Sequence, residues 1–123
     1  MLMLVPSAAA FVHIRASGRL GADDYRRFEP EFAAELERRE VPVPLLLDMR
    51  RFRGWSPRGF LRDLAWDFGN RRTFSRIAVI GDAPWHRWIT AAGAPLFRAP
   101  MKFFHPDHER DAEAWLAGRS SFI

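Results

Sequence analysis

Two hydrophobic patterns alternate along the chain, one typical of buried strands and one typical of half-exposed strands. Residues 45–47 and 77–80 are short apolar runs without polar alternation, as in strands that are covered on both faces by helices. Residues 9–16 instead alternate apolar and polar positions, as in a strand with one face in water. We therefore expect at least three strands, of which two lie inside the sheet.

Between these strands, apolar positions return at helical spacing. Helices are predicted over residues 22–39, from Ser56-Pro57 to about residue 70, over 84–92, and from Pro106 to a stop at Gly118. Serine and proline suit the first positions of a helix, and glycine suits its end. Pro30 falls within the first helix, which it must kink or divide, because proline donates no backbone hydrogen bond.

Strands that alternate with helices indicate an α/β fold. Residues 1–5 are predicted to form an edge strand, and residues 101–104 the last strand. We expect a single mixed, centrally parallel sheet of about five strands with helices on both faces. A chain of 123 residues suffices for one domain with a buried core, so residues 1–123 are predicted to be that domain.

The composition is that of a soluble globular protein. Hydrophobic residues make up 48% and charged residues 28% of the chain, and the apolar runs are too short to span a bilayer. The apolar start at residues 1–5 lacks a basic segment and precedes Pro6, so we interpret it as a strand and not as a signal peptide. We expect a cytoplasmic protein, peripheral to the membrane if it binds lipid. The absence of cysteine excludes disulfides and thiol chemistry.

Positive charge is concentrated in the middle of the chain. Residues 50–102 carry eleven Lys or Arg against three Asp, a net charge of +8, although the whole chain carries only +4. Such a segment attracts anionic lipid or an acidic protein, and we do not expect a nucleic acid partner. The alternative is that these arginines solvate helix faces.

The segment 43–57 predicts where a ligand binds. It is interpreted as a buried strand, then a basic and aromatic loop, then a helix start. Open α/β sheets bind ligands at the carboxyl ends of their strands. Asp48 ends the strand, and we expect it to pair with a nearby arginine or to accept loop N–H groups. The candidate anion or membrane surface consists of Arg50, Arg51, Arg53 and Arg87.

Aromatic side chains around the same ends could line an apolar pocket or lie at a lipid interface. The candidate ligand-binding residues are Trp55, Phe60, Trp66, Trp85 and Trp88. Core packing is the competing interpretation. Because small or turn-forming residues flank residues 84–92, this helix is a candidate lid.

Signals for an enzyme are weak. His13 has no nucleophile beside it, and Pro106 separates His105 from His108 in a way that disfavours a metal site. Neither a glycine-rich dinucleotide motif nor a phosphate-binding loop is present. We expect no catalytic activity, no metal and no cofactor; Asp48 and Asp82 are the carboxylates to test for chemistry.

Several motifs together resemble one family. They are Leu47-Asp48 with Phe52-Arg53-Gly54-Trp55, Arg76 to Asp82 followed by Trp85 and Trp88, and Ala114-Trp115-Leu116. Over nearly its whole length the chain resembles the SpoIIAA-like proteins, small bacterial domains of the STAS type that are similar to CRAL-TRIO lipid-carrying domains. The resemblance implies the fold, and suggests lipid or membrane association or STAS-like regulation.

The resemblance also draws attention to Ser56. STAS-type antagonists of anti-sigma factors are switched by phosphorylation of a serine at the start of the helix after a central strand, and Ser56 has a comparable place. Here, however, Gly54-Trp55-Ser56-Pro57 replaces the Asp-Ser-Ser-Gly type of sequence, and Ser56 is also explained as a helix cap. Two hypotheses follow: a binding module for a lipid or other apolar anion, and a protein interaction domain regulated near Ser56. Either is compatible with a homodimer.

Overall fold

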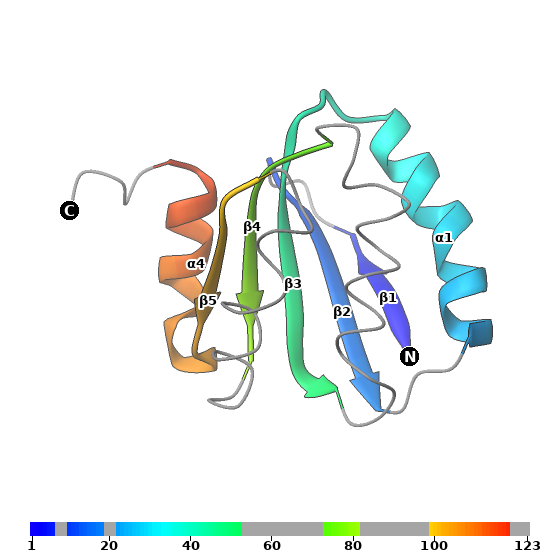
Figure 1. Cartoon of the computed structure of the whole chain (residues 1–123), viewed down its shortest axis with the longest axis horizontal. Coiled ribbons are helices and arrows are strands. Elements are labelled where there is room, and N and C mark those ends of the chain that lie inside the picture. Colours follow the sequence, from blue (N-terminus) through cyan, green and yellow to red (C-terminus); the bar gives the residue numbers. More distant parts are fainter. Residues whose placement is uncertain (7–9, 19–21, 53–72, 82–98, 119–123) are drawn as a thin grey trace.

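A five-stranded sheet organises the protein, with strand order β1-β2-β3-β4-β5 (Figure 1). The computed structural model describes residues 1–6, 10–18, 22–52, 73–81 and 99–118. The strands are β1 (Leu2–Val5), β2 (Val12–Gly18), β3 (Val43–Phe52), β4 (Phe74–Ile80) and β5 (Met101–Phe104).

The sheet is mixed and parallel at its centre, as predicted. Strand β1 pairs antiparallel with β2, and the pairs β2–β3, β3–β4 and β4–β5 are all parallel. Parallel neighbours place their carboxyl ends at the same edge of the sheet. This edge is where the polar residues of β2 and β3 gather.

Helix α1 (Ala22–Glu37) covers one face of the sheet. Its Phe28 and Phe32 stack with ring centroids 5.3 Å apart, and Phe32 also stacks on Phe74 at 6.1 Å. Of the two predicted effects of Pro30, a kink or a division, the division is wrong, because the helix runs undivided through this residue. Both phenylalanines, one on each side of Pro30, are buried in the same core, and this packing holds the helix together across the missing backbone hydrogen bond.

The opposite face is covered by α4 (Glu109–Leu116), which follows a short 3-10 helix, Pro106–His108. Figure 1 shows α4 running alongside β4 and β5, whereas α1 lies beside β1. Ala112 and Leu116 are buried against the sheet and Trp115 packs at the margin, so this face of α4 closes the second core. The helix ends as predicted, because Gly118 has a φ of 79°, a conformation that glycine adopts without strain.

The carboxyl end of α4 is fixed to the sheet by cations. The Arg76 guanidinium donates a hydrogen bond to the Trp115 carbonyl and lies 5.3 Å from the centroid of the Trp115 ring. Lys102 lies over the same ring and over Phe104. Cations suit the carbonyl end of a helix and the faces of aromatic rings, so this end of α4 has a defined position.

Strand boundaries differ from the sequence prediction chiefly in β3. Asp48, the predicted end of this strand, lies within β3, which continues to Phe52 because Ser17 and Gly18 of β2 pair with Arg51 and Phe52. Arg50 and Arg51 therefore lie in a strand, and their assignment to a loop is wrong. Pairing with a neighbouring strand outweighs the local preference of charged residues for loops.

The burial of β3 and β4 on both faces confirms that they are interior strands. Leu46 and Val79 are both fully buried. Leu46→Ala should lower the free energy of unfolding by about 2 to 5 kcal/mol, because it leaves a cavity between the sheet and α4. The measurement is urea denaturation. Met3→Ala is the control, since Met3 is exposed and its truncation should change stability by less than about 0.5 kcal/mol. Equal losses in the two variants would contradict this assignment of the core.

Candidate functional site

A cavity of about 510 Å³ lies at the carboxyl ends of β2 and β3. This is the edge at which open α/β sheets bind ligands. Its lining, as far as the structure describes it, consists of polar side chains: Arg15, Ser17, Asp48, Arg50, Arg51 and Glu109. Three strongly basic and two acidic groups thus share one cavity.

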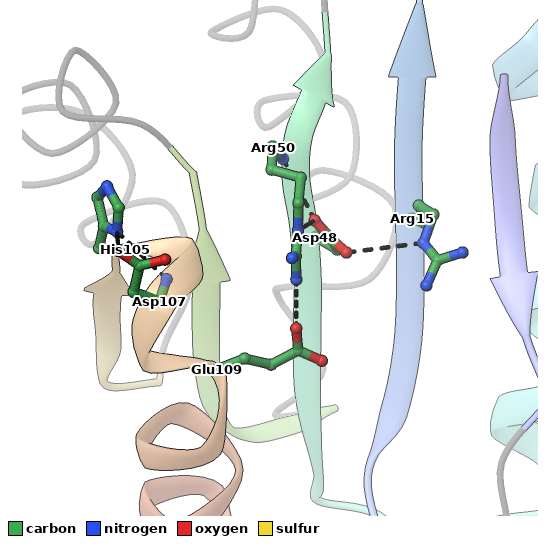
Figure 2. A network of polar contacts seen from close by, with 6 residues as sticks. All are labelled: Arg15, Asp48, Arg50, His105, Asp107 and Glu109. Atoms are coloured by element: carbon green, nitrogen blue, oxygen red, sulfur yellow. Dashed lines mark hydrogen bonds and ion pairs between the residues drawn. The ribbon is translucent and has the colours of Figure 1, made fainter.

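Asp48 is the centre of the polar network in Figure 2. Its side chain is only 4% exposed. Its Oδ1 accepts hydrogen bonds from the Arg50 backbone N–H at 3.2 Å and from the Arg50 Nε at 2.9 Å. The Arg15 Nε lies 3.6 Å from Oδ2. The pairing with Arg50 is as the sequence predicts; the pairing with Arg15 was missed, because it depends on the register that sets Arg15 beside Asp48.

Arg50 connects the sheet to α4. Besides its bonds to Asp48, its guanidinium donates to Glu109, the first residue of α4. Burial of Arg50 works against its charged form, but the hydrogen bonds to Glu109 and Asp48 outweigh that effect and raise the pKa of Arg50 above its usual value. Two carboxylates therefore compensate the charge of Arg50 and engage its Nε–H and one terminal N–H group.

Arg51 reaches the cavity through an irregularity in β3. Arg15 of β2 pairs with Asp48 of β3, and Ser17 of β2 pairs with Arg51 of β3. Between these two pairs, β3 therefore has one more residue than β2. Such a bulge redirects the side chains that follow it. Strict alternation would send Arg50 and Arg51 to opposite faces, yet both line the cavity.

Arg15 and Arg51 are the cations available to a ligand. The Arg15 side chain is 43% exposed, and its one ion-pair contact among the described residues is the 3.6 Å approach to Asp48. Arg51 is exposed, and no hydrogen bond or ion pair joins its side chain to another residue in the part of the chain that the structure describes. Two guanidinium groups on neighbouring strands can together bind a carboxylate or a phosphate.

His13 lies two residues before Arg15 on β2. Its Nε2 atom is buried and has no hydrogen-bond partner within the described ranges, although the residue as a whole is only half-buried. Burial first, and then the charge of Arg15, lower the pKa of His13; Asp48 and Glu109 oppose the shift and Arg50 adds to it. The neutral imidazole is therefore the form that suits the folded protein.

The two histidines after β5 serve local contacts. The His105 Nδ1 accepts a hydrogen bond from the Asp107 N–H at 3.2 Å and lies 3.5 Å from the Asp107 carboxylate, as Figure 2 shows. The His108 Nδ1 lies 3.1 Å from the Asp111 carboxylate. Within the described residues, no group of three metal-ligating side chains is found.

All five aromatic candidates lie outside the described residues. The candidates that lie outside the described residues are Arg53, Trp55, Ser56, Phe60, Trp66, Asp82, Trp85, Arg87, Trp88 and the predicted lid helix over 84–92. Of the predicted anion surface, Arg50 and Arg51 are in the cavity. Among the helices that the structure describes, none is long and apolar enough to cross a membrane.

The lowered pKa of His13 predicts that stability decreases in mild acid. The unfolded chain takes up a proton near the ordinary pKa of 6.5, but the folded protein resists it. Protonation thus favours unfolding as the pH falls through 6.5, and stability recovers as the pH rises. Urea denaturation between about pH 5 and pH 8 should show a smaller loss for His13→Gln than for the unmodified protein. Identical pH profiles would contradict a half-buried imidazole that is neutral in the folded protein.

Comparison with known proteins agrees with this architecture. Residues 11–117 match the model of the SpoIIAA-like family. A solved structure of an uncharacterized protein with a SpoIIAA-like fold from Shewanella loihica PV-4 is similar, with a TM-score of 0.72 and 25% sequence identity. The match covers 94% of this chain and 92% of that chain. No curated protein matches the chain. Because the family match spans most of the sequence and the fold agrees, the chain belongs to the SpoIIAA-like family, with its STAS-type α/β fold.

Proposed function

We propose that this protein is a non-enzymatic binding domain for an amphipathic anion, whose acidic group is held by Arg15 and Arg51. The observation that carries the proposal is the pair of guanidinium groups that line one cavity without a strong carboxylate partner among the described residues. The STAS-type fold supports a binding role over catalysis.

The charges around the cavity favour an anion. Asp48 and Glu109 both accept hydrogen bonds from Arg50, so the positive charge of Arg50 is compensated within the protein. Arg15 and Arg51 add two positive charges at the same cavity. Guanidinium groups bind carboxylates and phosphates with paired hydrogen bonds, and a partly enclosed site strengthens this attraction relative to open water.

A lipid is the ligand that the sequence favours. The segment 50–102 carries a net charge of +8 and four of the five tryptophans, a combination suited to an anionic bilayer surface. We propose that residues 84–92 contact the membrane through Trp85 and Trp88, with Arg87 adding attraction. This part of the proposal rests on the sequence, since these residues lie outside those that the structure describes.

STAS-like recognition of a protein partner near Ser56 is the second candidate, and membership of the family favours it. The two candidates differ in what accompanies the purified protein. Lipid seen by native mass spectrometry supports the first, whereas a ligand-free protein that forms a defined complex through the Ser56 region supports the second.

Removing either available arginine should weaken binding to anionic vesicles. Arg15→Gln and Arg51→Gln should each raise the dissociation constant about tenfold, because each removes hydrogen bonds between charged groups. The measurement is tryptophan fluorescence during titration with vesicles of anionic lipid, with zwitterionic vesicles as the lipid control.

Arg26→Gln is the matched protein control. It removes the same charge from α1, where Arg26 pairs with Asp23 in water, so its binding should change by no more than about twofold. If all three variants bind alike, the cavity does not hold the anion and the proposed function is wrong.

A further inference from the structure

The lining of the cavity indicates which part of a ligand enters it. All of its described lining residues carry polar or charged groups, so they suit a polar head group better than an acyl chain. We infer that the cavity takes a phosphorylated polyol, with the phosphate between Arg15 and Arg51 and a neighbouring hydroxyl on Glu109. This inference rests on the proposed function and specifies the chemistry of its ligand.

The phosphate position follows from the arrangement of donors. Arg15 and Arg51 lie on adjacent strands, and Ser17, which pairs with Arg51 in the sheet, also lines the cavity. Two guanidinium groups and a hydroxyl can donate to several oxygens of one phosphate. A carboxylate, with two oxygens, would use fewer of these donors.

The hydroxyl position follows from the acceptors. Asp48 is buried and both of its oxygens face arginines. Glu109 is 37% exposed, its Oε1 accepts from Arg50, and no donor in the described ranges is recorded for its Oε2. Glu109 is therefore the carboxylate that can accept a hydrogen bond from a ligand, and a carboxylate is a strong acceptor for a hydroxyl. A second anionic group at this position would be repelled.

The size of the cavity fits a head group. Its volume of about 510 Å³ holds roughly 15 to 20 water-sized groups at about 30 Å³ each. A glycerol phosphate fits within this space, but a whole phospholipid does not. The same chemistry occurs in a lipid head group and in a free sugar or polyol phosphate, so the experiment must separate the two sources.

Two matched pairs of ligands test the inference. Calorimetry compares glycerol 3-phosphate with ethyl phosphate, which has the same phosphate but no hydroxyl. Vesicle titration compares phosphatidylglycerol with phosphatidylethanol in the same way. The hydroxyl-bearing member of at least one pair should bind about tenfold more tightly. Tighter binding of glycerol 3-phosphate than of ethyl phosphate identifies a free polyol phosphate as the ligand. If only phosphatidylglycerol binds more tightly than its partner phosphatidylethanol, the ligand is a lipid head group.

Glu109→Met tests the assigned acceptor. It should reduce the preference for the hydroxyl-bearing ligand to about twofold or less. Inorganic phosphate should bind as well as before or better, because the substitution removes a negative charge and releases Arg50. Glu113→Met removes the same charge from α4 one turn further on and should keep the preference.

The possible failures are distinct. No preference in either pair overturns the polyol inference, but the proposed function still stands if Arg15→Gln and Arg51→Gln weaken vesicle binding. A preference that survives in Glu109→Met overturns the role of Glu109. Loss of inorganic phosphate binding in Glu109→Met also contradicts the assigned positions.

Discussion

The buried carboxylate of Asp48 is the constraint on which the site depends. A charge taken out of water is costly unless cations and hydrogen bonds compensate it. Asp48 is almost completely buried within an interior strand, and its compensation comes from Arg50 and Arg15. Since Arg50 also binds Glu109, this single charge connects β2, β3 and the start of α4.

This constraint separates the arginines of the site into two kinds. Arg50 is enclosed between two carboxylates and holds the structure together. Arg15 and Arg51 line the same cavity but have weaker contacts with carboxylates among the described residues. The extra residue of β3 is essential to this division, because it brings Arg51 to the cavity instead of to the opposite face. The fold thus converts a run of basic residues into one structural cation and one available cation.

The sequence predicted the features that depend on local pattern. The apolar runs around Leu46 and Val79 identified two interior strands, and the face of Trp115 and Leu116 identified the helix that covers them. The pairing of Asp48 with Arg50 was also accessible, because the two residues are close in sequence. These predictions succeeded because burial and helical periodicity are encoded within a few residues.

The rest of the site depends on contacts between distant segments. The approach of Arg15 to Asp48 needs the parallel register of β2 and β3, and the position of Arg51 needs the bulge. Glu109 enters the cavity only because α4 starts beside the end of β3. The hydrophobic periodicity of a sequence does not indicate which residues of neighbouring strands pair. The sequence analysis therefore placed Arg50 and Arg51 in a loop and omitted Arg15 and Glu109 from the candidate site. The predicted tryptophan site lies outside the described residues and stays a prediction.

The proposed site requires that Arg50 stays bound within the protein while Arg15 and Arg51 bind a ligand. The most direct measurement is NMR of the arginine Nε–H groups, assigned by single Arg→Lys variants, during titration with inorganic phosphate. We expect the Arg15 and Arg51 signals to shift together and to saturate at the same concentration, while the Arg50 signal stays within its starting linewidth. A shift of Arg50 with Arg15 and Arg51 unchanged would contradict this division of roles.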